Sequence, residues 1–125
     1  MKIVKCDVCG NTAVLIENGK GAMICCGKPM RELIPQVSDE GSEKHVPVTE
    51  EGRCLTSVKV GSVPHPMSDL HHVAWIALET EDGFSLRYLT PDTNPEAIFY
   101  AGGKPSKAYE YCNIHGLWSS FLAIE

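Results

Sequence analysis

Two cysteines near the start of the chain have the spacing of a metal-binding turn. Cys6 and Cys9 are separated by two residues, and Gly10 follows the second of them. Two thiolates at this spacing can reach one ion, while the glycine allows the chain to turn beneath it. The segment is therefore a candidate for half of a four-sulfur metal site.

A second pair of cysteines is adjacent rather than spaced. Neighbouring side chains of a regular strand point to opposite faces, so Cys25 and Cys26 can share one ion only at a turn. Gly27 and Pro29 favour a turn at this point. Four sulfur ligands suit zinc or iron, and spacing leaves both open, because zinc ribbons generally have a second C-x-x-C. Disulfide bonds are the less favoured alternative, because reducing compartments do not maintain them.

Histidines are confined to the rest of the chain, where four of them and one cysteine form a second candidate site. His65 and His71 stand six residues apart around a proline, and His115 follows Cys112 by three residues. His71 and His72 are adjacent, so only one of them can face a metal from a strand, and spacing does not decide which. Taken singly, each histidine is more typical of a surface or hydrogen-bonded side chain, so an incidental cluster is the alternative. The candidates are His45, His65, His71, Cys112 and His115.

Short strands and tight turns must position the cysteines. Apolar, β-prone runs at residues 3–5, 12–17 and 22–24 predict strands, and Asn18-Gly19 is a strong signal for a two-residue hairpin. A segment of about 36 residues is too small to hold a core without a covalent or metal cross-link. Residues 36–42 are polar and rich in turn formers, so we expect a linker there.

The remainder of the chain predicts a β-sandwich. Apolar runs recur at intervals of roughly ten residues, which is typical of that fold. We therefore expect a small domain at residues 1–36 and a larger one at residues 37–125. Cys54 has no neighbour at metal-binding spacing and is expected to be a small buried side chain, while Trp75 is expected in the core or beside a metal. The predicted strands are residues 53–60, 73–79, 84–89, 96–101, 107–112 and 117–124.

The composition limits the classes of partner. The 125 residues are 43% hydrophobic and 22% charged, as in globular proteins, and the net charge is −5. This charge offers no general phosphate-binding surface, so we expect no nucleic-acid partner. No run approaches the roughly 18 apolar residues of a membrane span, and the N-terminal residues have no apolar signal-peptide core. We therefore expect no membrane association and a cytoplasmic location.

Motifs along nearly the whole chain resemble the desulfoferrodoxin family, the two-iron superoxide reductases. The resemblance implies a mainly β fold, in which a small desulforedoxin-like or rubredoxin-like metal-binding domain precedes an immunoglobulin-like β-sandwich. The motifs that carry it are Cys6-x-x-Cys9-Gly10, Cys25-Cys26-Gly27-x-Pro29-Met30, Glu43-Lys44-His45-Val46-Pro47-Val48, Val58-Lys59-Val60-Gly61-Ser62-Val63-x-His65-Pro66-Met67, Trp75-Ile76 and Tyr111-Cys112-Asn113-x-His115-Gly116-x-Trp118.

The resemblance also implies ligands and roles. It implies two mononuclear iron sites, one with four cysteines and one with four equatorial imidazoles and an axial thiolate. His72 is spare, because the family usually has an aromatic residue there. Lys44 would attract superoxide, and Glu43 would bind the oxidised resting iron. The first iron would be held by Cys6, Cys9, Cys25 and Cys26, and the second by His45, His65, His71, His115 and Cys112.

The implied activity is the one-electron reduction of superoxide to hydrogen peroxide, at a ferrous centre without haem. The family receives electrons from a small external donor such as rubredoxin and usually forms a homodimer. Two alternatives differ in class. One is an electron carrier that works through its four-sulfur iron, and the other is a non-catalytic module with structural zinc in the cysteine site. Metal content and colour separate the three hypotheses, because four-thiolate ferric iron is intensely coloured and zinc is colourless.

Overall fold

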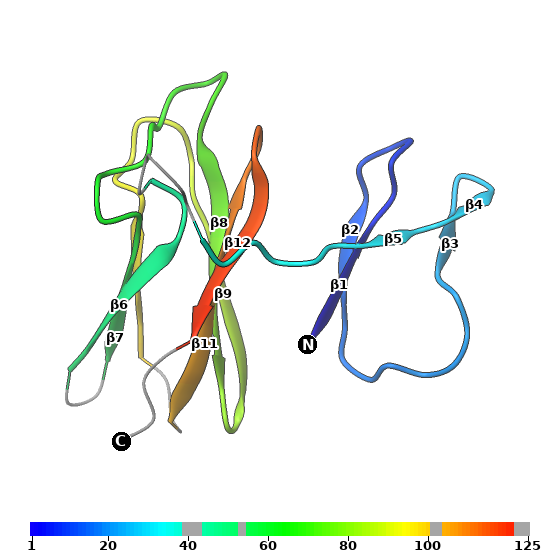
Figure 1. Ribbon diagram of the computed structural model, residues 1–125, viewed down its shortest axis with the longest axis horizontal. Coiled ribbons are helices and arrows are strands. Elements are labelled where there is room, and N and C mark those ends of the chain that lie inside the picture. Colours follow the sequence, from blue (N-terminus) through cyan, green and yellow to red (C-terminus); the bar gives the residue numbers. More distant parts are fainter. Residues whose placement is uncertain (39–43, 53–54, 101–103, 122–125) are drawn as a thin grey trace. The chain divides into compact units, whose positions relative to one another are not determined.

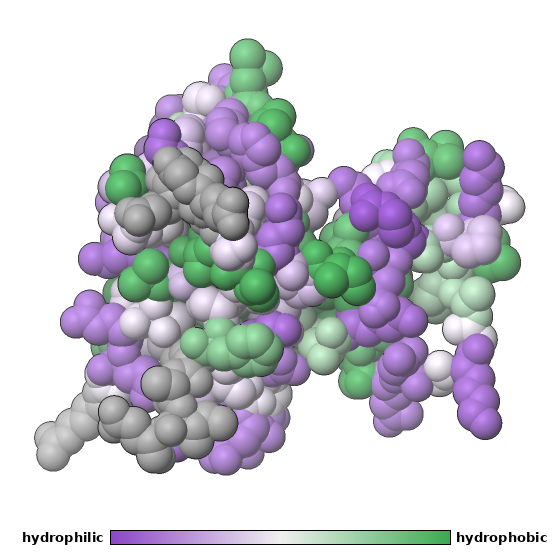
Figure 2. Space-filling model, viewed as in Figure 1, coloured by the Kyte–Doolittle hydropathy of each residue, from purple (hydrophilic) through white to green (hydrophobic). Residues whose placement is uncertain are grey.

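The computed structural model describes residues 1–38, 44–52, 55–100 and 104–121. It divides the chain into two compact units, Met1–Ile34 and Pro35–Glu125. The regular elements of the described residues are all β-strands, and these residues include no helix that could cross a membrane. Figure 2 shows hydrophilic side chains interspersed among hydrophobic ones over the visible face of each unit.

The first unit is a three-stranded sheet with a separate short hairpin. Antiparallel strands β1 (Lys2–Lys5), β2 (Thr12–Leu15) and β5 (Arg31–Glu32) follow the order β2-β1-β5 (Figure 1). Strands β3 (Ile24–Cys25) and β4 (Lys28–Pro29) pair with each other. The buried apolar side chains of this unit are few, as its length requires; they are Ile3, Val4, Cys6 and Leu33.

The turn signal at Asn18-Gly19 is a wrong prediction. Strand β2 ends at Leu15 and pairs with β1, not with a strand that follows Gly19. The turn that closes the β1–β2 hairpin lies at residues 6–11, where Cys6 N donates to Asn11 O over 2.8 Å. The β1–β2 hairpin therefore forms around the motif of Cys6 and Cys9.

The second unit is a sandwich of two antiparallel sheets, which confirms the predicted fold. One sheet has the order β10-β7-β6 and the other the order β12-β11-β8-β9 (Figure 1). The first sheet contains β6 (Pro47–Glu51), β7 (Thr56–Val60) and β10 (Glu96–Phe99). The second contains β8 (Val73–Thr80), β9 (Gly83–Tyr88), β11 (Pro105–Cys112) and β12 (Gly116–Phe121).

Alternating side chains from both sheets fill the interior of the sandwich. On β8, Ile76 and Leu78 face inward and are fully buried, and they pair with Glu110 and Ala108 of β11. Cys112 follows on the same face of β11 two residues after Glu110, so the core geometry points its thiol inward. The core cluster is Val58, Val60, Val73, Ile76, Leu78, Ala97, Phe99 and Ala108.

Two segments of this unit differ from the expectation. Strand β6 was not predicted, and β7 begins at Thr56, while the expected strand start at residue 53 and Cys54 lie outside the described residues. Gln36, expected in a linker, forms a parallel β-bridge with Trp118 of β12. The bridge places the beginning of the second unit directly beside the strand that follows His115.

Candidate metal centres

A tight turn solves the problem of the two adjacent cysteines. Cys26 and Gly27 are the central residues of the β3–β4 hairpin, and their φ angles are +54° and +74°. Positive φ at both central positions is the mark of a type I′ turn, whose twist matches that of paired strands. The turn lets the thiols of Cys25 and Cys26 approach to 4.0 Å, which a regular strand would prevent.

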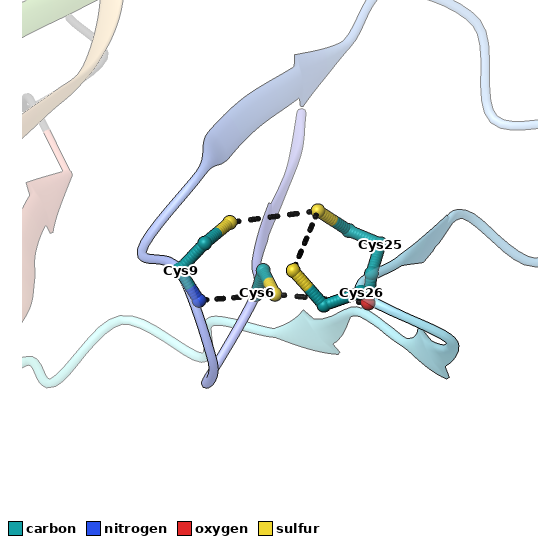
Figure 3. Close-up of side chains that lie close together, drawn as sticks. All are labelled: Cys6, Cys9, Cys25 and Cys26. Carbon is teal, nitrogen blue, oxygen red and sulfur yellow. Dashed lines mark hydrogen bonds between the residues drawn. The ribbon is translucent and has the colours of Figure 1, made fainter.

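The four sulfur atoms are spaced as ligands of one ion. All lie within 4.8 Å of one another, and the Cys9 and Cys25 sulfurs are 3.6 Å apart (Figure 3). Four sulfurs around an ion at about 2.3 Å would be separated by about 3.8 Å. The donor set and its spacing therefore fit a tetrahedral metal.

Backbone N–H groups prepare the first of these thiols for binding. Hydrogen bonds from the backbone of Cys9 and Val8 lower the pKa of Cys6 to about 6. The neighbouring thiols raise the pKa of Cys26 to about 12, with the side chain of Cys9 the largest cause. One thiolate is thus available at neutral pH, and the remaining protons must leave when a metal binds.

Three connections of the sandwich carry the second group of candidate residues. His45 precedes β6, and His65 and His71 lie in the β7–β8 connection. Cys112 ends β11, and His115 lies in the turn before β12. The pairing of β11 with β8 shifts register between Tyr111 and Cys112, an irregularity of the kind that re-aims a side chain beside a site.

The four imidazoles form a closed ring. Each contacts two others edge to face, with centroids 4.7–5.0 Å apart and interplanar angles of 71–79°. The order around the ring is His45, His65, His71, His115. His45 Nε2 and His115 Nδ1 are 3.0 Å apart, and two nitrogens at right angles around an ion at about 2.1 Å would also be about 3.0 Å apart. Ligand atoms of three of these imidazoles, those of His45, His65 and His71, lie within 4.8 Å of one another, and His115 joins them through its contact with His45, so the ring could hold a metal ion.

Two nitrogens of this ring have no hydrogen-bond partner among the described residues. His65 Nε2 and His71 Nε2 are buried and make no hydrogen bond with the described residues. His65 Nδ1 lies 2.7 Å from Pro66 O, so it carries the proton and leaves a lone pair on Nε2. Burial lowers the pKa of His65 to about 4, and burial and then the charge of His115 lower that of His71. Both rings are therefore neutral at pH 7, the form that binds a metal.

The thiol of Cys112 completes the group. It is fully buried, and its sulfur lies within 4.8 Å of ligand nitrogens of His45, His65 and His71. His115 Nδ1 is 3.8 Å from this sulfur, and the backbone N–H of His115 donates to it over 3.4 Å. Burial raises the pKa of Cys112, so the thiol keeps its proton until a metal displaces it.

Gly61 sets the position of the segment that carries Lys44 and His45. Its φ is +81°, and a Cβ there would lie 2.7 Å from the backbone of Lys44 and 2.5 Å from Val63 O. Gly61 N also donates to Val46 O over 3.1 Å. A side chain at this position would push apart the segments that lead to His45 and His65, so only glycine fits.

The structure distinguishes between residues that the sequence left open. The His72 ring is not one of the four in the ring of imidazoles; its Nδ1 is 3.0 Å from Ser68 O, and its backbone bonds to Asn113. The ring stacked on a candidate ligand is Trp118, 4.6 Å from His45, whereas Trp75 stacks on Tyr111. The sequence analysis placed none of Trp118, Asn113 and Gln36 at the metal site. Lys44 is exposed, and Glu43 lies outside the described residues.

Comparisons with known proteins agree with this geometry. The family model described as Desulfoferrodoxin matches residues 37–121, and the model described as Desulfoferrodoxin, N-terminal domain, matches residues 1–33. The chain belongs to the desulfoferrodoxin family. A desulfoferrodoxin of Syntrophotalea carbinolica is 44% identical over 120 residues, which cover 96% of this chain and 95% of that protein.

Relatives of the family also include proteins named for an activity. A superoxide reductase of Thermococcus kodakarensis is 41% identical, covering 70% of this chain and 92% of its own length. The crystal structure of the superoxide reductase from Treponema pallidum superposes with a TM-score of 0.82 at 31% identity, and the match covers 95% of this chain and 96% of that one. The match therefore includes residues of both units of this chain.

Proposed function

We propose that the chain is a superoxide reductase, which converts superoxide to hydrogen peroxide at the site of its second unit. The reaction consumes one electron and two protons for each superoxide, and the electrons come from a small external donor protein such as rubredoxin. The observation that carries the proposal is the closed ring of four imidazoles with the Cys112 thiol against it. An incidental cluster would not leave His65 Nε2 and His71 Nε2 buried without partners.

We assign iron to both sites, four sulfurs holding one ion and the imidazole ring with Cys112 the other. Iron bound in the second site would supply the electron to superoxide, with one coordination position left for the substrate. Four neutral imidazoles and one thiolate contribute a single negative charge, so a divalent ion keeps a positive charge that attracts an anion. The Cys112 thiolate would push electron density toward iron bound there, as cysteine ligands do in haem enzymes.

Lys44 is the residue to which we assign capture of the substrate. It is exposed, it adjoins His45, and its charge is one of those that act on His71, after burial and the neighbouring imidazoles. A cation at the rim of a positive site concentrates superoxide and steadies the product by a charged hydrogen bond. Glu43, by the family pattern, would bind the oxidised iron in the resting state.

We also propose a role for the first unit, a cellular location and an oligomeric state. The four cysteines of the first unit would hold an iron that either relays electrons or stabilises a unit with few buried apolar side chains. Cysteines grouped as metal ligands are typical of reducing compartments, so we also assign the chain to the cytoplasm. We also assign a homodimer to this chain, because the family that it belongs to usually forms one.

A matched pair of cysteine variants tests the assignment of the reaction to the second site. In iron-loaded Cys112→Ser, the ferrous protein should no longer react with superoxide, and the thiolate-to-iron optical band of that site should vanish. Cys26→Ser alters the other site and should leave the reaction at its wild-type rate, because its unit contributes no ligand to the ring. Retention of wild-type turnover by Cys112→Ser would show that the assignment is wrong.

A further inference from the structure

The turn that carries His115 is held from one side by Gln36. Gln36 N donates to Leu117 O over 3.0 Å, and Ser119 N donates to Gln36 O over 2.9 Å, so the backbone of Gln36 is fixed along β12. From that anchor, its side-chain Nε2 donates to His115 O over 2.8 Å. A carboxamide on a fixed backbone thus fixes the peptide group between His115 and Gly116.

Asn113 holds the same turn from the other side. Its Oδ1 accepts from His72 N over 2.8 Å, its Nδ2 donates to Leu70 O over 3.0 Å, and its backbone N donates to His72 O over 3.1 Å. These three bonds fasten the turn to Leu70 and His72, the residues on either side of His71. The segment that ends at His71 is itself closed by bonds between Ser68 and His71, of 2.9 Å and 3.2 Å.

We propose that Gln36 and Asn113 act together as a carboxamide clamp that positions the ligands of the second metal site. The proposal rests on the proposed function in one respect, which is that His71, Cys112 and His115 are metal ligands. Neither side chain is aimed into the imidazole ring, so both are positioning residues. Their shared target is the turn at residues 113–116, which must place the His115 ring and the N–H that binds Cys112 at the same time.

Through this one turn, the clamp acts on three ligands, which are His71, Cys112 and His115. A displacement of the His115 backbone would move Nδ1 from its place 3.0 Å from His45 Nε2 and weaken the 3.4 Å bond from His115 N to Cys112 Sγ. A loosened Asn113 would release the backbone on either side of His71. Hydrogen bonds to groups that orient metal ligands are typically worth about 10- to 100-fold in metal affinity.

Because the two side chains of the clamp are exposed, their substitution can affect the metal site without much effect on the stability of the fold. Gln36 and Asn113 are both exposed, and a single net hydrogen bond contributes only about 0.5–1.5 kcal/mol to stability. Replacement of either residue by alanine should leave the core of the sandwich unchanged. The expected loss therefore concerns the metal site first and the free energy of unfolding little.

Zinc retention by the full chain tests the clamp without any enzymatic assay. The wild type and the variants Gln36→Ala, Asn113→Ala and Asn113→Asp are loaded with zinc, and transfer to a chelator is followed by NMR at His115 and at Cys9. Zinc should leave the second site about 10- to 100-fold faster in both alanine variants, with faster amide exchange at His115 and unchanged release from the first site. Asn113→Asp keeps the acceptor for His72 N and should be intermediate.

Ser106→Ala is the matched control, because Ser106 Oγ donates to Glu79 O over 3.2 Å in another exposed bond between a side chain and the backbone. It should release zinc as the wild type does. Three outcomes would overturn the clamp and leave the proposed function intact. Zinc could leave both alanine variants at the wild-type rate, its release could be accelerated equally at the two sites, or Ser106→Ala could accelerate it as much as the alanine variants do. A wild-type chain without zinc in the second site would overturn the ligand set as well.

Discussion

Replacement of Gly61 by alanine should lower both the stability of the second unit and its reaction rate. The loss of stability should be larger than for another glycine with a positive φ angle. Gly61 has φ +81°, where an L-residue costs about 1–2 kcal/mol. Its new Cβ would in addition lie 2.5 Å from Val63 O and 2.7 Å from the Lys44 backbone, while ordinary contact begins near 3.4 Å. One or both segments must therefore move by about 0.7–0.9 Å.

Gly116 provides the matched control. Its φ of +85° imposes the same strain, but a Cβ there would meet only Gln36 Nε2, at 3.8 Å. Overpacking typically adds about 1–3 kcal/mol, so Gly61→Ala should lose about 2–5 kcal/mol and Gly116→Ala about 1–2 kcal/mol. A displacement near 1 Å can cost about 10²-fold in rate, and Gly61→Ala should slow the superoxide reaction by at least about tenfold.

Denaturant unfolding of the metal-free chains and rapid mixing of the ferrous chains with superoxide measure the two effects. The difference in unfolding free energy between the alanine variants isolates the contacts of Gly61 with Lys44 and Val63, because the strain at positive φ is common to both. Equal free energies of unfolding for Gly61→Ala and Gly116→Ala, or a wild-type superoxide rate for Gly61→Ala, would refute the view that Gly61 positions the segments of His45 and His65.

Three further outcomes follow from the charges and contacts of the two units. Lys44→Ala should slow the encounter with superoxide about tenfold at low ionic strength and flatten its salt dependence, and an unchanged rate would make Lys44 an ordinary surface lysine. Zinc binding to the metal-free chain at pH 7 should release about one proton fewer from Cys112→Ser than from the wild type, because burial raises the pKa of the Cys112 thiol; equal release in an indicator assay would contradict this. A chain without residues 1–34 should stay folded by circular dichroism and bind one metal ion, whereas loss of either would show that the units form one cooperative structure.

Local chemistry made much of the first unit predictable. The two-residue spacing of Cys6 and Cys9 and the turn required by Cys25 and Cys26 follow from how far thiols reach, and the φ angles at the β3–β4 turn agree with that requirement. Asn18-Gly19 misled because a turn dipeptide forms a hairpin only when the strands on its two sides pair. Here β2 pairs instead with β1, across the cysteine turn.

The parts of the second unit that escaped prediction depend on contacts distant in sequence. Strand β6 begins with Pro47 and ends in two glutamates, a composition tolerated because β6 lies at the edge of its sheet. Gln36 joins β12 through a bridge of one residue, which leaves no periodic pattern. The choice between His71 and His72 depends on Ser68 O, which binds the spare ring.

Hydrogen peroxide formed per superoxide consumed is the measurement that tests the central claim most directly. The iron-loaded chain is supplied with a steady flux of superoxide and an excess of a chemical reductant, and peroxide and dioxygen are followed together. Reduction at the imidazole–thiolate site predicts one peroxide for each superoxide, no dioxygen, and loss of the activity when the reductant is exhausted. One peroxide and one dioxygen for every two superoxides, sustained without reductant, would show a dismutase and contradict the account.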